Sequence, residues 1–234
     1  MQPDLRSIHD VSQPGTQEIA VRQNKVLRNT YLLLAATLIP TAIGALLGMN
    51  LQFTFLRTNP MLSAFGILAI FYGWIWAIER NRTSGVGVAL LLGFTFFLGI
   101  LLGPLLHRVL GFSNGGQLVA MAAGGTAVTF FGLSAVASNV KRDFSGMAKF
   151  LFVGFIVIML AVIANIFFHI PALMLTILVA FIIFSSMVIL YQVNAIVRGG
   201  ETNYISATLT LYVALYNIFS SLLQLLGIFG GRSD

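Results

Sequence analysis

The chain of 234 residues contains no cysteine, and only 9% of its residues are charged. Without cysteine there are no disulfide bonds, no thiol nucleophile and no metal site built on thiolates. The scarcity of charge excludes an ordinary soluble domain, in which about a quarter of the residues are charged. Apolar residues make up 58% of the chain instead. A protein of this size keeps so much apolar surface only when lipid surrounds it.

Charge is also missing from the interior of seven apolar stretches that make up most of the chain. They are Tyr31–Leu51, Met61–Ile78, Ser84–Leu106, Gln117–Ala137, Ala148–Phe168, Pro171–Tyr191 and Ile205–Phe229. Each is close to the ~20 residues with which a helix crosses a ~30 Å hydrocarbon core. We therefore predict an all-α integral membrane protein with seven transmembrane helices, which form a single domain over residues 29–234. The alternative is six crossings and one re-entrant or interfacial segment, because the last stretch is amphipathic.

Residues 1–28 are polar and include two prolines, so we predict a disordered tail there. The tail's side of the membrane follows from the Lys and Arg residues, ten of which share that side if the spans alternate. They are Arg6, Arg22, Lys25, Arg28, Arg80, Arg82, Lys141, Arg142, Lys149 and Arg198, whereas Arg57, Arg108 and Arg232 fall on the other side. The positive-inside rule then predicts a cytoplasmic N-terminus and, after seven spans, an outside C-terminus. Because the net charge of +6 is spread over these links, we expect a lipid bilayer and not nucleic acid as the partner.

Polar side chains gather in the last three stretches. The candidate polar cluster comprises Asn165, Ser185, Gln192, Tyr212, Tyr216, Asn217, Ser220 and Gln224. In the last stretch its members recur about every four residues and so share one helix face. Polar groups inside a membrane turn toward other helices or toward a water-filled cavity. The cluster is therefore either hydrogen-bonding glue between helices or the wall of a cavity, and the frequent use of Ser, Asn and Gln as glue favours the first.

Small residues recur at helix-packing spacing in two stretches. Gly44 and Gly48 form a GxxxG pattern in the first, and Thr95, Gly99 and Gly103 form a similar stripe in the third. Such stripes let two membrane helices approach closely. We predict a close helix contact at these positions.

No pattern of a catalytic or metal site is present. All seven acidic residues lie in tails, links or helix ends, and HExxH and GxSxG are absent. The three histidines have no paired spacing, so we predict no metal site, no cofactor and no enzymatic activity. The charged residues at helix ends on the cytoplasmic side are expected to form interfacial ion pairs. They are Glu79, Arg80, Arg82, Arg198 and Glu201.

Several short motifs resemble those of the Bax-inhibitor-one family, also called TMBIM, and of its bacterial branch in particular. The two strongest are Gly199-Gly200-Glu201-Thr202-Asn203-Tyr204-Ile205 and Leu211-Tyr212-Val213-Ala214-Leu215-Tyr216-Asn217-Ile218-Phe219. Three further motifs add to them, namely Lys25-Val26-Leu27-Arg28-Asn29-Thr30-Tyr31, Gly124-Gly125-Thr126-Ala127 and Ala164-Asn165-Ile166-Phe167. The resemblance covers nearly the whole chain beyond the tail. It implies six helices around a central seventh, and a place in the bacterial inner membrane.

The resemblance implies two functions. Bacterial members are described as binding and restraining the membrane AAA protease FtsH, and other members as pH-sensitive calcium leak channels governed by an aspartate pair on the last two helices. This chain has Gln192 and Ala214 at those two positions. Neither side chain titrates, and calcium prefers several anionic or carbonyl oxygens. We therefore expect an interaction protein that restrains an FtsH-type protease, with a weakened cation leak channel or transporter as the alternative.

Overall fold

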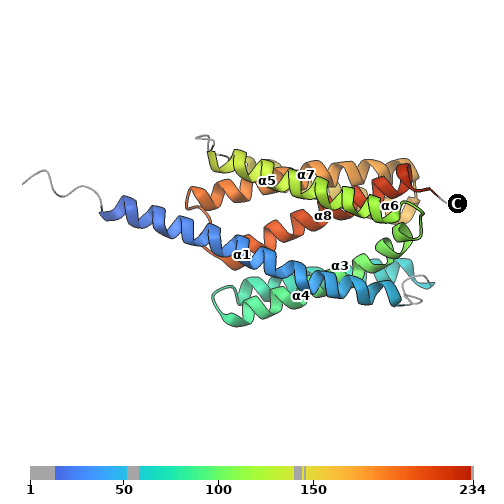
Figure 1. Cartoon of the computed structure of the whole chain (residues 1–234), viewed down its shortest axis with the longest axis horizontal. Coiled ribbons are helices and arrows are strands. Elements are labelled where there is room, and N and C mark those ends of the chain that lie inside the picture. Colours follow the sequence, from blue (N-terminus) through green and yellow to red (C-terminus); the bar gives the residue numbers. More distant parts are fainter. Residues whose placement is uncertain (1–13, 52–57, 140–143, 145, 233–234) are drawn as a thin grey trace, which may run out of the picture.

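The computed structural model describes residues 14–51, 58–139, 144 and 146–232. Within these residues the chain forms seven helices and no strand. The helices are α1 (Pro14–Asn50), α3 (Pro60–Arg80), α4 (Gly85–Leu110), α5 (Gly115–Asn139), α6 (Met147–Phe168), α7 (Pro171–Val197) and α8 (Tyr204–Gly230). All seven contain a segment long and apolar enough to cross a membrane, and they pack side by side in one bundle (Figure 1). The prediction of an all-α protein with seven transmembrane helices is confirmed.

Helix α8 lies at the centre of the bundle. It packs against α1, α3, α4, α5 and α7, and buried residues recur along it from Ile205 to Leu223. The sixth neighbour implied by the family resemblance, α6, packs closely on α7 instead. Only Leu151 and Ile158 are buried on α6, so most of its surface is left for lipid. Five helices therefore surround α8 directly, and α6 covers the outside of α7.

The links between helices gather at two opposite ends of the bundle. At the Arg82 end, Asn203 Nδ2 donates to the backbone oxygen of Arg82 at 2.8 Å. At the Asn114 end, Asn114 Nδ2 donates to Gly230 O at 2.7 Å. Helix α8 starts at the first end and finishes at the second, so it runs the full length of the bundle. This placement favours a seventh crossing over the re-entrant alternative.

Helices α1 and α4 are in close contact along the glycine stripes. A Cβ atom built on Gly99 would overlap the carbonyl oxygen of Thr41, and one built on Gly44 would overlap that of Phe96. Only glycine allows the two backbones to approach so closely. The close contact predicted from the spacing is confirmed.

The N-terminal segment differs from its prediction. Residues 1–13 lie outside the described residues, but α1 already begins at Pro14, so residues 14–28 are helical and not a disordered tail. The segment is polar, yet Gln, Glu, Ala, Arg, Lys and Leu in it are good helix formers. Extending an existing helix costs far less than nucleating a new one. The membrane-spanning part of α1 therefore carries the helix outward, and α1 projects beyond its neighbours (Figure 1).

Candidate functional site

The polar face of α8 divides into a part that bonds to other helices and a part that lines a cavity. Tyr212 belongs to the first part and is only 2% exposed. Its hydroxyl lies 2.7 Å from Thr41 Oγ1 on α1 and donates to Thr95 O on α4 at 3.3 Å. One side chain thus connects three helices by hydrogen bonds, which is the geometry expected of interhelical glue.

Tyr216 and Asn217 belong to the second part. Both line a partly open cavity of about 470 Å³, whose other lining residues come from α3, α4, α6, α7 and α8. Most of the lining is aliphatic or aromatic, for example Phe71 on α3 and Phe184 on α7. Ligand-binding pockets have volumes of roughly 300–1,000 Å³, so the cavity has the size of a binding site.

The other predicted members of α8 lie elsewhere. Ser220 Oγ donates to Asn217 O in its own helix at 3.3 Å, and Gln224 is half-buried further along. Neither side chain is among those that line the cavity. The regular four-residue spacing of the stripe therefore covers three different environments.

The members of the cluster on α6 and α7 are also separated. Ser185 is fully buried and lines the cavity, whereas Gln192 is 6% exposed and lies outside its lining. Asn165 is half-buried on α6. Among the described residues, Ser185 Oγ, Gln192 Nε2 and Asn165 Oδ1 have no hydrogen-bond partner. The structure thus brings Ser185, Tyr216 and Asn217 together around one cavity.

The two positions at which the family resemblance implies aspartates are buried. Gln192 is one, and Ala214, which is 2% exposed and lines the cavity, is the other. A methyl group therefore stands in the cavity wall where a carboxylate is implied, and among the described lining residues only Glu79, at one end, carries a carboxylate.

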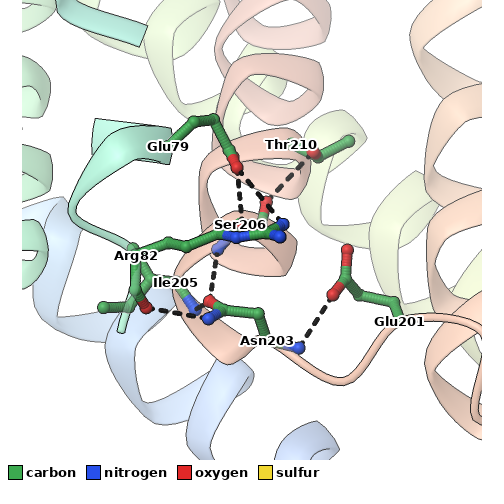
Figure 2. A network of polar contacts seen from close by, with 7 residues as sticks. All are labelled: Glu79, Arg82, Glu201, Asn203, Ile205, Ser206 and Thr210. Atoms are coloured by element: carbon green, nitrogen blue, oxygen red, sulfur yellow. Dashed lines mark hydrogen bonds and ion pairs between the residues drawn. The ribbon is translucent and has the colours of Figure 1, made fainter. Parts of the chain in front are cut away.

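One carboxylate does line the cavity, at the Arg82 end. Glu79 Oε2 accepts a hydrogen bond from Ser206 Oγ at 2.9 Å and lies 3.7 Å from Arg82 Nη1 (Figure 2). The side chain of Arg82 is 52% exposed. Thr210, which also lines the cavity, donates to the backbone oxygen of Ser206 at 3.1 Å. The polar network of Figure 2 therefore reaches one end of a mostly apolar space through Glu79 and Thr210.

The loop before α8 holds this network in place. Asn203 is the N-cap of α8, where its Oδ1 accepts hydrogen bonds from the backbone N–H groups of Ile205 and Ser206 at 2.9 and 3.1 Å. Its Nδ2 reaches the Arg82 carbonyl, and its own N–H donates to Glu201 Oε1 at 2.8 Å (Figure 2). Capping satisfies N–H groups that the first turn of a helix leaves without partners. It also fixes Ser206 beside Glu79.

The five charged residues predicted to form interfacial ion pairs have different surroundings. Glu79 and Arg82 pair as expected, but Glu201 binds a backbone N–H. Arg80 places its guanidinium 5.3 Å from the centre of the Trp76 ring, and Arg198 is an exposed residue at the C-cap of α7. The predicted set therefore divides between the network and the outer surface.

Sequence reasoning missed Asn203 and Ser206 as parts of this network, and Thr41 and Thr95 as partners of Tyr212. An Asn immediately before a long apolar stretch is a helix-start pattern, so the cap was detectable. The pairing of Ser206 with Glu79 joins residues 127 positions apart, and no local pattern indicates it.

No group of three or more His, Asp or Glu side chains that is suited to a metal ion occurs in the part of the chain that the structure describes. The cavity has a single carboxylate, and that carboxylate has Arg82 and Ser206 as partners. The arrangement is therefore suited to an apolar or amphiphilic occupant and not to a cation held by several carboxylates.

Comparison with known proteins identifies relatives over nearly the whole chain. A family described as "Inhibitor of apoptosis-promoting Bax1" matches residues 23–231. A protein of Escherichia coli K12 named "Modulator of FtsH protease YccA" is 42% identical over 204 residues, which cover 87% of this chain and 90% of that protein. An uncharacterized protein of Neisseria meningitidis serogroup A is 45% identical over 214 residues, with 88% and 92% covered. One of Pseudomonas aeruginosa is 43% identical over 206 residues, with 88% and 90% covered.

Proposed function

This chain belongs to the family of inhibitors of apoptosis-promoting Bax1, and we propose that it binds and restrains a membrane-anchored AAA protease of the FtsH type. The observation that carries the proposal is its 42% identity, over 87% of its length, to a protein named as a modulator of FtsH. A second protein with the same extent of identity is named as an inner membrane protein. The proposal accordingly includes the bacterial inner membrane as the location.

Helix α1 supplies a feature that such a protease can grip. Its 37 residues correspond to about 55 Å at 1.5 Å per residue, whereas a hydrocarbon core is about 30 Å thick. The surplus projects past the other helices at the Arg82 end (Figure 1). Residues 1–13, which precede it in the sequence, are mostly polar, and the first residues of a domain are frequent points of proteolytic attack.

The bundle itself would resist extraction after the protease has gripped it. Helix α8 is enclosed by five helices, and Tyr212 ties it to α1 and α4. Pulling on α1 therefore strains the glycine contact with α4 and the bonds to α8 at once. A substrate that is engaged readily and unfolded slowly occupies the protease and reduces its turnover of other substrates.

The test is degradation of an unrelated membrane substrate by the purified protease in vesicles, with and without this protein at matched amounts. We expect slower degradation with the full chain and recovery of the rate when residues 2–20 are deleted. The deletion spares Gln23, whose side chain lies against Gly199. A third variant carries an unrelated polar segment of equal length in place of residues 2–20.

The third variant separates two forms of the proposal. Slowed degradation with the unrelated segment means that any grip suffices and that the protein acts as a competing substrate. Recovery of the rate means that residues 2–20 are recognised as a dedicated inhibitory element. An unchanged rate with the full chain, together with no co-purification, would refute both forms.

A cation leak through the cavity is the alternative function. It is favoured by Glu79, Ser185 and Asn217 in the cavity lining, and it is opposed by Ala214, because the middle of the cavity carries no carboxylate. The test is ion flux in vesicles with Asn217→Leu, using Gln224→Leu as the matched control outside the lining. Flux that Asn217→Leu abolishes and Gln224→Leu preserves would support the leak, and equal flux in both variants would exclude this path.

A further inference from the structure

The cavity has a direction, from one membrane surface toward the middle of the bundle. Its face on α3 runs from Glu79 back to Ile67, a span of about 18 Å at 1.5 Å per residue. Half of a hydrocarbon core of ~30 Å is about 15 Å. The cavity therefore has the depth of one leaflet of the bilayer.

The Arg82 end of the cavity lies at the level of the lipid headgroups. Trp76 is 63% exposed on the outer face of α3, and Arg80 stacks over its ring. Trp and Arg side chains anchor membrane helices at the boundary between hydrocarbon and water. Glu79 is the neighbour of Arg80 in sequence, so it and Arg82 lie at that boundary, while Ile67 and Leu68 line the deep end of the cavity.

The cavity meets the surrounding lipid between α3 and α6. Helix α6 packs closely on α7, and α3 on α4 and α8, so side chains and not backbones close the seam between α3 and α6. Tyr72 and Phe155 meet there with ring centroids 6.5 Å apart, and the Tyr72 hydroxyl donates to Met159 Sδ at 3.7 Å. Tyr72 and Phe155 line the cavity and are also 41% and 36% exposed. The wall facing the bilayer is thus one side chain thick.

We propose that the cavity holds one acyl chain of a membrane phospholipid, which enters between Tyr72 and Phe155 and places its headgroup phosphate at Arg82. Three features of the cavity indicate that its occupant is an acyl chain. They are its apolar lining, its depth of one leaflet and its contact with the surrounding lipid. The exposed guanidinium of Arg82 is the group that would bind the headgroup phosphate, because arginine binds phosphate through paired, charge-assisted hydrogen bonds. Glu79 acts as a positioning residue, since its carboxylate holds Arg82 at the end of the cavity.

The polar atoms at the deep end are compatible with an acyl chain. The Ser185 hydroxyl has no hydrogen-bond partner within the described part of the chain, and the carbonyl of Phe181 lies one helical turn before it. Its neighbour Ser186 already donates to Ile182 O in this way at 2.8 Å. A change of the Ser185 χ1 rotamer would bring its hydroxyl to a carbonyl of α7 in the same way and leave carbon facing the cavity.

The first test uses the unaltered protein in vesicles of phosphatidylethanolamine and phosphatidylglycerol that contain a phospholipid with a photoreactive group near the end of one acyl chain. We expect cross-links to inward-facing lining residues such as Phe184 and Val213. Cross-links confined to outward-facing residues such as Phe152 and Val153, which are 66% and 58% exposed, would overturn the proposal.

The second test fills the cavity. Val213→Trp places a large ring in it, whereas Val153→Trp places the same ring on the outer face of α6. Native mass spectrometry of protein released from the same vesicles should show one retained phospholipid for the unaltered chain and for Val153→Trp, and none for Val213→Trp. Equal retention in both variants would contradict the proposal. If Val213→Trp does not fold, the cross-linking result decides alone.

The third test addresses the headgroup. Arg82→Gln should reduce retention by about tenfold, the scale of one lost charge-assisted hydrogen bond. Arg80→Gln is the matched control, because Arg80 lies on the outer face over Trp76. Similar losses in the two variants would mean that Arg82 has no special role in holding phosphate. The proposal does not depend on the protease assay, since lipid retention and proteolysis are measured separately.

Discussion

At the scale of single residues, Tyr212 has an unusual position because one hydroxyl meets two other helices. It contacts Thr41 on α1 and the Thr95 carbonyl on α4, and all three groups lie well inside the bundle. Lipid supplies no competing hydrogen bonds at this depth. The hydrogen bonds of the Tyr212 hydroxyl are therefore retained in the folded state. Their net contribution to stability is reduced because the same hydroxyl also finds partners in the unfolded state within the membrane.

We expect Tyr212→Phe to lower the free energy of unfolding by about 0.6 kcal/mol, the average for hydrogen bonds between membrane helices, and by no more than about 1.7 kcal/mol, the largest value found for one. Unfolding by detergent titration in mixed micelles measures it. Combining the change with Thr41→Val gives a double-mutant cycle, in which the two effects should be less than additive. Strict additivity would mean that the two hydroxyls do not interact.

Asn203 combines a helix cap with a tie to the neighbouring link. We expect Asn203→Ala to cost about 1 kcal/mol for the lost cap and to increase the mobility of the link at Arg82. Asn59→Ala is the matched control, because Asn59 occupies the N-cap of α3 without a side-chain cap hydrogen bond. Thermal unfolding of the two variants compares them. Equal losses of stability would mean that the capping geometry of Asn203 contributes nothing.

Individual polar residues were identifiable from the sequence, but their environments were not. The four-residue spacing of Tyr212, Tyr216 and Ser220 correctly places them on one face of a helix. A central helix, however, has different neighbours along its length. Tyr212 meets α1 and α4, Tyr216 meets a cavity, and Ser220 bonds within α8. Periodicity fixes the face of a helix, whereas its neighbours depend on the packing of the other helices.

At the scale of elements, the contact between α1 and α4 shows how backbone proximity depends on the absence of side chains. Gly99 has no room for a Cβ atom beside Thr41, whereas Gly124 on α5 has nothing within 4 Å of the corresponding position. The two glycines lie in helices of similar length, which allows a direct comparison.

We expect Gly99→Ala to destabilise the protein by about 1–3 kcal/mol, because an added methyl group in a tightly packed contact forces backbones apart. Gly124→Ala should be neutral or stabilising, because Ala favours the helix over Gly by up to about 1 kcal/mol. Melting temperatures in detergent measure both. The prediction fails if the two substitutions have the same effect.

Helix boundaries could be predicted from the sequence where a helix ends at the limit of an apolar stretch. Both ends of α6 and the start of α7 at Pro171 follow from the apolar stretches. The other end of α7 does not, because the helix continues past the predicted Tyr191 to Val197. The start of α1 could not be predicted either, because residues 14–28 are outside the hydrocarbon and their helix depends on propensity and on continuation of the spanning segment. Hydropathy reports where a helix crosses a membrane and not where it begins.

At the scale of the whole molecule, the two ends of the bundle are distinct in charge. The Arg82 end contains the links after α3 and α7, whereas the Asn114 end contains the link after α4 and the C-terminal residues, with Arg232 N donating to Asn114 Oδ1 at 3.2 Å. Of the arginines that the structure describes, five lie at the first end and two at the second. The five are Arg22, Arg28, Arg80, Arg82 and Arg198, and the two are Arg108 and Arg232. The excess of positive charge predicts that this end faces the cytoplasm.

The lack of cysteine makes this prediction directly testable, because a single introduced cysteine is the only thiol in the chain. Thr83→Cys reports on the Arg82 end, and Gly116→Cys reports on the Asn114 end, where both positions are exposed and Gly116 has open space around it. A membrane-impermeant maleimide added to intact spheroplasts should label Gly116→Cys and leave Thr83→Cys unlabelled. Permeabilised cells provide the control, in which both variants react. The reverse pattern would place the N-terminus outside and α1 out of reach of a cytoplasmic protease, so the same experiment decides whether the proposed restraint is geometrically possible.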